Sequence, residues 1–192
     1  MRIEGGKLPA RQERRIEHMK IIRSDQADYA DIRARGDDAL FDLTAKFDGV
    51  RLTSESLRVP QADLEAAWNG ISGELRSALE AAHRNIVAFA KKSLRQNWSF
   101  HNEQGAEVGE VFFPFERVGC YVPGGTAPLV STALMTVSLA AAAGVPQIVV
   151  CTPCGRDGTV NAGLLAALKL AGATEIYKVG GAQAIAAMAF GT

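Results

Sequence analysis

Hydrophobic residues recur every three or four positions through much of the first hundred residues, which is the spacing of an amphipathic helix. In the segment 37–49, Leu40, Leu43 and Phe47 form one stripe, an aspartate at the start is the expected cap and an Asp-Gly pair is the expected stop. The segment 59–70 has the pattern of a shorter helix opened by a proline. The N-terminal region is therefore predicted to be mainly helical.

The longest amphipathic pattern covers 72–94, with charged residues opposite an apolar stripe of Leu75, Leu79, Ala82, Ile86 and Phe89. We expect four of these side chains to be buried, namely Leu75, Leu79, Ile86 and Phe89. His83 lies beside the stripe without a carboxylate or a second histidine at ligand spacing. It is expected to be a helix-flank residue and not a metal ligand.

The period of the pattern changes after about residue 102, where Val108, Val111 and Phe113 alternate with glycines and predict an extended ribbon or hairpin. From Arg117 onward, continuously apolar strands alternate with helical segments. Strands are predicted at 117–123, 146–153 and 174–181, and helices at 127–144, 160–172 and 182–192.

This alternating part contains an internal repeat. Ala143-Gly144 followed by Ile148 matches Ala171-Gly172 followed by Ile176, about the length of one βα crossover. The pattern predicts an α/β fold with a buried parallel sheet between helical layers, that is, a three-layer α/β/α arrangement. We divide the chain into 1–116, a helical region plus β ribbon, and 117–192, a βαβαβα partial Rossmann-like domain. Three strands make a thin sheet, and nothing after the last helix is predicted to cover its edge.

Glycine-containing loops follow all three predicted strands, and loops after parallel strands meet at one edge of a sheet, where open α/β sheets bind ligands. Two of the loops, Pro123-Gly124-Gly125 and 179–181, have adjacent glycines before a helix N-terminus, which suits a phosphate. Tyr121 and Gln183 flank these loops and offer a phenol and an amide to a ribose or a nucleotide ring. Neither loop matches the G-x-G-x-x-G or Walker pattern, no acidic residue follows at ribose-binding spacing, and ligand binding and plain tight turns both remain open.

The charge balance excludes one class of partner. Lys plus Arg equals Asp plus Glu at 21 each, so no net field attracts nucleic acid. The locally basic start of the chain contains Glu13 and Glu17 and is interpreted as a solvated helix face. No signal-peptide pattern is present, and the uncharged stretch 118–155 is divided by prolines and glycines into pieces too short to span a bilayer. We expect a cytoplasmic protein without membrane contacts.

Three cysteines, Cys120, Cys151 and Cys154, make an odd set that argues against a disulfide framework. Cys151 and Cys154 form a C-x-x-C pattern, which raises a thiol-redox function or a zinc site. The pair follows a strand and leads into a glycine-containing loop, whereas a thioredoxin-like pair lies at a helix N-terminus. Chance spacing of buried or turn cysteines is the favoured interpretation.

Several stretches of the chain resemble the histidinol dehydrogenase family: 32–50, 116–136, 143–153 and, most specifically, 169–192. The resemblance implies a zinc-dependent enzyme that oxidises L-histidinol to L-histidine through the aldehyde in two NAD-linked steps of histidine biosynthesis. It also implies a cytoplasmic homodimer with an incomplete Rossmann-like fold related to aldehyde dehydrogenases. The family's NAD-contacting tyrosine and glutamine correspond to Tyr121 and Gln183, and Pro123, Gly124 and Gly125 belong to the same cofactor-binding edge.

The family's zinc ligands and catalytic Glu-His pair have no counterpart in this sequence, so no catalytic or metal-binding residue is predicted here. We therefore expect these 192 residues alone to be inactive. The alternatives are a family member acting on another polyol or amino alcohol, a non-catalytic nucleotide-binding module, and a thiol-redox protein.

Overall fold

A computed structural model of the chain describes residues 26–124 and 129–191. Its N-terminal part is built from five helices, which confirms the prediction of a mainly helical start within the described residues. They are α2 (Gln26–Arg35), α3 (Asp37–Phe47), α4 (Ser54–Leu57), α5 (Gln61–Gly70) and α6 (Gly73–Ser93). The locally basic segment that contains Glu13 and Glu17 lies outside the described residues.

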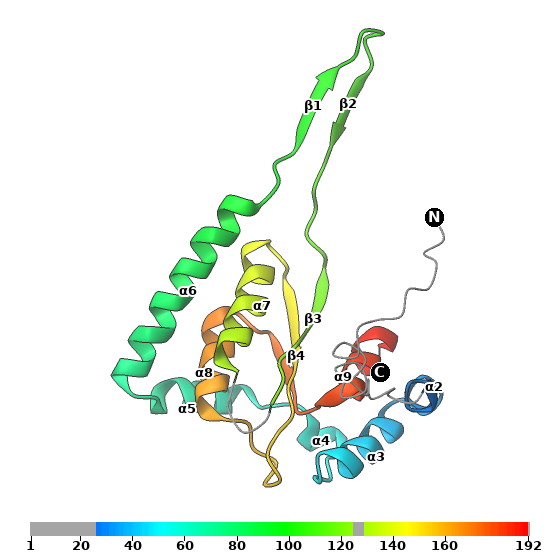
Figure 1. Cartoon of the computed structure of the whole chain (residues 1–192), viewed down its shortest axis with the longest axis vertical. Coiled ribbons are helices and arrows are strands. Elements are labelled where there is room, and N and C mark those ends of the chain that lie inside the picture. Colours follow the sequence, from blue (N-terminus) through cyan, green and yellow to red (C-terminus); the bar gives the residue numbers. More distant parts are fainter. Residues whose placement is uncertain (1–25, 125–128, 192) are drawn as a thin grey trace, which may run out of the picture.

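A two-stranded antiparallel ribbon follows α6 and projects away from the rest of the molecule (Figure 1). It consists of β1 (Trp98–His101) and β2 (Glu107–Glu110), so the predicted hairpin is present, but its first strand lies before residue 102 and its second ends before Val111. Trp98 and Phe100 stack with their ring centroids 6.1 Å apart, and each ring is about half exposed. The segment after the ribbon adds Phe113 and Phe115, which are 83% and 76% exposed, so the described residues leave an aromatic surface uncovered here.

The second sheet is parallel, with the order β3 (Arg117–Tyr121), β4 (Gln147–Cys151) and β5 (Glu175–Tyr177), as predicted. It lies between two helical layers (Figure 1). On one face, Ile148, Val150 and Ile176 pack into a large core formed with α5, α6, α7 (Val130–Ala142) and α8 (Ala162–Ala171). On the other face, Cys151 packs with residues of α3, α4 and α9 (Gly181–Phe190). The α/β class with helices on both faces is confirmed.

The internal repeat has a clear physical basis in the two crossover helices. Gly144 after α7 and Gly172 after α8 both have positive φ angles, 86° and 98°, at the point where each helix ends. The left-handed conformation favours glycine and turns the chain back toward the next strand. Asn161 opens α8 by accepting a hydrogen bond from the backbone N–H of Leu164.

One edge of the parallel sheet is covered, contrary to the sequence-based expectation. The segment after α4 runs antiparallel to β5: the N–H of Val59 donates to the carbonyl of Ile176, and the N–H of Lys178 donates to the carbonyl of Leu57. These hydrogen bonds satisfy the outer side of β5. The covering segment precedes β5 in sequence by more than a hundred residues, which is why no local pattern predicts it.

Three details of the predicted helices are wrong. Gly36, with a φ of 61° and no side chain, occupies the N-cap position of α3 in place of an aspartate. Leu75 and Phe89, which were expected to be buried, are 38% and 74% exposed, whereas Leu79 is buried at 4% and Ile86 is partly buried. An amphipathic stripe shows which side chains are suited to burial, but the neighbouring elements decide which of them are covered.

A polar network connects the amino ends of the three parallel strands. The guanidinium of Arg117 donates to Gln147 at 2.9 Å and to Glu175 at 3.2 Å, and the Tyr177 hydroxyl donates to Glu175 at 2.6 Å. The Tyr177 hydrogen bond, followed by that of Arg117, lowers the pKa of the Glu175 carboxyl. Glu175 is therefore a partly buried member of this network.

His83 joins α6 to α7. Its Nδ1 lies 2.9 Å from the hydroxyl of the fully buried Ser138 in a hydrogen bond, and burial lowers the pKa of the imidazole. The prediction of a helix-flank residue is consistent with this structural role. Among the residues that the structure describes, no helix is both long and apolar enough to cross a membrane.

We predict that Ile148→Ala lowers the free energy of unfolding by about 2–5 kcal/mol, because it leaves a cavity in the core between the sheet and α7. Phe89→Ala is the matched control and should change it by less than about 0.5 kcal/mol, since that ring is 74% exposed. Urea unfolding monitored by circular dichroism measures both. A larger loss for Phe89→Ala than for Ile148→Ala would contradict the assignment of the core.

Candidate functional site

The loops that follow the three parallel strands meet at one edge of the sheet, which we call the carboxyl edge: residues 122–124, 152–154 and 178–181. Tyr121 ends β3, and its hydroxyl oxygen accepts a hydrogen bond of 3.0 Å from the backbone N–H of Gly181. The loop after β3 is thereby tied to the N-terminus of α9. Two loops separated by sixty residues in sequence become neighbours at this edge.

Gln183, in the first turn of α9, folds back against the same glycine. A Cβ atom placed on Gly181 would lie 2.5 Å from Gln183 Oε1, and Gly181 has a φ of 64°, so only glycine fits this position. The Gln183 side chain is buried, with 5% of its surface exposed, and its Nε2 has no hydrogen-bond partner among the described residues. The structure therefore brings Tyr121 and Gln183 together around Gly181.

The remaining predicted site residues lie around Pro153, in the loop after β4. Cβ atoms on Gly124 and Gly180 would approach the Pro153 ring to 2.4 Å and 2.6 Å. Both glycines are thus required by close packing of a proline ring, whatever else the loops bind. Pro123 is partly buried beside Gly124 at the same edge, and Gly125 lies outside the described residues.

Asp48, at the C-terminus of α3, also reaches this edge, and the sequence analysis did not identify it. Its Oδ2 would lie 3.4 Å from a Cβ on Gly180. Burial raises the pKa of the Asp48 carboxyl, and the backbone N–H of Gly180 opposes this effect. A pattern of residues along the chain gives no signal for this placement, because it results from the packing of α3 against α9.

Buried polar atoms without partners concentrate in this part of the molecule. Within the described residues five such side-chain atoms occur, and four of them belong to the carboxyl edge or to α3 beside it: Thr44 Oγ1, Asp48 Oδ2, Thr152 Oγ1 and Gln183 Nε2. Burial of a polar group without a hydrogen bond costs about 1–3 kcal/mol. Such groups in a native structure are rare, and a bound ligand is one way to satisfy them.

The three cysteines do not have the properties of a redox pair. All are free thiols, and burial raises the pKa of Cys151 to about 11 and also raises that of Cys154. A catalytic thiol requires a lowered pKa so that the thiolate is populated near neutral pH. The C-x-x-C pattern arises from a buried strand residue followed by a turn.

Within 26–124 and 129–191, no three His, Cys, Asp or Glu side chains are grouped so that they could hold a metal ion. His83 belongs to the α6–α7 contact and His101 to the ribbon, away from the carboxyl edge. Asp157, in the loop after β4, is exposed, and its carboxylate accepts hydrogen bonds from the backbone and hydroxyl of Thr159.

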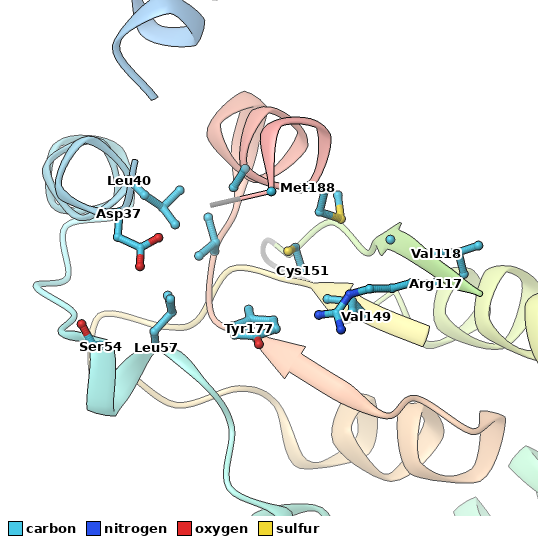
Figure 2. Close-up of a pocket in the computed structure, with 14 residues that line it drawn as sticks. Asp37, Leu40, Ser54, Leu57, Arg117, Val118, Val149, Cys151, Tyr177 and Met188 are labelled. Carbon is cyan, nitrogen blue, oxygen red and sulfur yellow. The ribbon is translucent and has the colours of Figure 1, made fainter. Parts of the chain in front are cut away.

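A cavity of about 430 Å³ lies beside the last turn of α9. Figure 2 shows Asp37 and Leu40 of α3, Leu57 of α4 and Met188 of α9 around it, with Tyr177 and Arg117 on the strands. Its lining includes the first residues of β3, the last residues of β4 and β5 (Cys151 and Tyr177), Val179 after β5, and the last turn of α9, whereas Gln183 and Gly181 belong to the first turn. Ten helical residues span about 15 Å, so the cavity lies at the other end of α9 from Gln183, although Val179 borders both regions.

Comparison with known proteins gives one consistent result. A family model described as histidinol dehydrogenase matches residues 12–192. The chain is 45% identical to a histidinol dehydrogenase of Symbiobacterium thermophilum over 161 residues. This aligned region makes up 84% of this chain and 37% of that protein. The chain is 48% identical over 162 residues to a histidinol dehydrogenase of Deinococcus radiodurans, covering 84% of this chain and 36% of the relative.

The comparison with solved structures agrees. The crystal structure of histidinol dehydrogenase from Elizabethkingia anophelis matches with a TM-score of 0.81 and 34% identity, over 98% of this chain and 41% of that chain. The chain thus spans a little over a third of the length of these curated relatives and about two fifths of the solved structure.

We predict that Cys151 is alkylated by iodoacetamide only as the pH approaches 11, because the thiolate is the reactive form and burial raises the pKa. Mass spectrometry of peptides after alkylation at pH 7, 8, 9 and 10 measures the extent at each cysteine. A model peptide with an unperturbed thiol is the reference. Faster labelling of Cys151 or Cys154 than of the peptide at pH 7 would restore the thiol-redox interpretation.

Proposed function

The chain belongs to the histidinol dehydrogenase family, and from this premise we propose that its carboxyl edge binds the nucleotide of an NAD-dependent dehydrogenase. We propose residues 117–192 as the partial nucleotide-binding domain and 1–116 as the helical region with its ribbon. NAD supplies the hydride acceptor when it is bound. The described residues contribute binding and orientation of that cofactor.

The observation that carries this proposal is the buried and unpartnered amide nitrogen of Gln183. It lies in the first turn of α9, where the backbone N–H groups and the positive end of the helix dipole favour an anionic or strongly polar ligand. A nucleotide offers the acceptor that this amide lacks. The residues present therefore fit the cofactor that the family uses.

The proposed cofactor contacts are completed by residues at the end of β3 and in the loop that follows it: Tyr121, Pro123, Gly124 and Gly125. The Tyr121 hydroxyl is held by the N–H of Gly181, which fixes the ring beside Gln183. The rings of Pro123 and Pro153 offer apolar surface to a nucleotide base. Orientation by such rigid groups is what a hydride-transfer site requires of its binding residues.

The reaction, the metal, the location and the assembly of the whole protein are also proposals. The reaction is the oxidation of L-histidinol to L-histidine through the aldehyde in histidine biosynthesis, carried out with zinc by a cytoplasmic homodimer. It is supported by family membership alone, since no metal-ligand group occurs in the part of the chain that the structure describes. A family member acting on another polyol or amino alcohol is the alternative, and a non-catalytic nucleotide-binding module is the second.

We predict that Gln183→Ala weakens NAD binding about 10-fold, because the buried amide donates to the cofactor and is otherwise unsatisfied. Isothermal titration calorimetry with NAD on this chain measures the change. Gln104→Ala, on the turn of the ribbon, is the matched control and should leave the affinity unchanged. Equal affinities for the two variants would remove Gln183 from the proposed contacts.

We also predict that this polypeptide alone produces no NADH from histidinol, NAD and zinc. Alcohol oxidation needs a base or a metal-polarised oxygen to remove the hydroxyl proton. Neither His83 nor His101 lies at the carboxyl edge, and Asp157 is exposed and engaged with Thr159. Asp48 lies at that edge beside Gly180, but no histidine or metal-ligand group of the described residues accompanies it there. Absorbance at the NADH band against a protein-free blank is the measurement, and turnover that copurifies with the chain would overturn this expectation.

A further inference from the structure

We propose that Asp48 is a nucleotide-positioning residue whose carboxylate accepts a hydrogen bond from an O–H or N–H group of the nucleoside part of NAD. This inference rests on the function proposed above, because it needs a nucleotide at the carboxyl edge. It adds an acidic partner that the sequence pattern lacks, since no acidic residue follows the loop Pro123-Gly124-Gly125 at the spacing of a dinucleotide-binding fingerprint.

The position of Asp48 connects it to the residues already described. It is the C-terminal cap of α3, and its N–H donates to the carbonyl of Thr44 at 2.9 Å. Its Oδ2 approaches Gly180, and the next residue, Gly181, contacts both the Tyr121 hydroxyl and the Gln183 amide. An acceptor from α3 and a donor from α9 thus border the same two-residue turn.

The carboxylate of Asp48 is poorly compensated in this structure. Within the described residues no Lys or Arg pairs with it, and the buried Oδ2 has no hydrogen-bond partner. A negative charge at a helix C-terminus is also disfavoured by the helix dipole. Burial, the unpaired oxygen and the unfavourable helix dipole all destabilise the charged carboxylate of Asp48. We therefore expect a partner that compensates this cost.

A structural role for Asp48 accounts for only part of this arrangement. The N–H of Gly180 favours the charged form of the Asp48 carboxyl, but no hydrogen bond of ordinary geometry reaches Oδ2 from the described residues. A neutral cap at the end of α3 would avoid the cost of the charge. A hydrogen-bond donor from a ligand satisfies that oxygen.

The charge of the carboxylate selects the part of the nucleotide that lies beside it. Phosphate groups are repelled by a neighbouring carboxylate, whereas ribose hydroxyls and the adenine amine are donors that a carboxylate accepts. Ribose binding by an acidic side chain is the usual arrangement in dinucleotide-binding sheets. The nucleoside part of the cofactor is therefore placed toward α3, with its phosphates farther from Asp48.

The test compares NAD binding by the wild-type chain and by Asp48→Ala, Asp48→Asn and Asp38→Asn, using isothermal titration calorimetry. Asp38, exposed in the first turn of the same helix, is the matched control. We expect Asp48→Ala to weaken NAD binding about 10-fold or more, Asp48→Asn to weaken it less, and Asp38→Asn to leave it unchanged. Backbone amide NMR spectra of each variant verify that the fold is retained.

Analogues of the cofactor, bound to the wild type and to Asp48→Asn, identify the donor. AMP and nicotinamide mononucleotide each contain one nucleoside of NAD, and the one whose affinity falls in Asp48→Asn is the one beside the carboxylate. Nicotinamide hypoxanthine dinucleotide lacks the adenine amine. If it binds the wild type more weakly than NAD does, and this difference disappears in Asp48→Asn, the amine is the donor; an undiminished difference assigns the contact to a ribose hydroxyl.

The two proposals fail in different ways. If the wild-type chain and Asp48→Asn bind NAD and both mononucleotides equally, Asp48 has no positioning role, while nucleotide binding at the edge stands. If Gln183→Ala and the wild type also bind alike, the nucleotide lies elsewhere. Absence of any NAD, AMP or nicotinamide mononucleotide binding by the wild type would overturn the proposed function and the role of Asp48 together. Asp48→Asn preserves the side-chain shape, so the comparison remains decisive if Asp48→Ala does not fold.

Discussion

The contact of Pro153 with two glycines determines the shape of the carboxyl edge. The proline ring follows the central strand of the sheet and fits against Gly124 on one side and Gly180 on the other, with no space for a Cβ atom at either position. This contact holds the loops after β3 and β5 against the loop after β4. The Gly181–Tyr121 hydrogen bond then has both partners in place, and the end of α3 packs over the same turn.

The parts of this arrangement that depend on local sequence are predictable. Continuous apolar strands, helices that end at Gly144 and Gly172, and a constant repeat length indicate a parallel sheet and its carboxyl edge. The neighbourhood of Tyr121 and Gln183 follows from that geometry. Asp48 and Thr152 are not predictable in this way, because their burial without partners results from contacts between elements far apart in sequence.

The dependence of burial on contacts between distant elements also explains the wrong burial assignments on α6. Periodicity identifies a face, and Leu79 and Ile86 on that face pack into the main core. Phe89 lies near the C-terminal end of α6, which leads to the projecting ribbon (Figure 1), and its side chain is 74% exposed. The aromatic residues of the ribbon share this exposure. A hydrophobic pattern thus gives the direction a side chain faces, and only the three-dimensional arrangement gives its neighbours.

Unsatisfied polar atoms locate the candidate site better than empty volume does. The cavity beside the last turn of α9 has a volume of about 430 Å³, and two of its polar lining residues, Arg117 and Tyr177, are hydrogen-bonded to Glu175. The carboxyl edge retains a buried amide nitrogen and a buried carboxylate oxygen without partners among the described residues. An apolar cavity costs only lost packing contacts, whereas each of these atoms loses a hydrogen bond to water on folding. A nucleotide, which has both acceptors and donors, compensates both groups at once, and for this reason the edge is the stronger candidate.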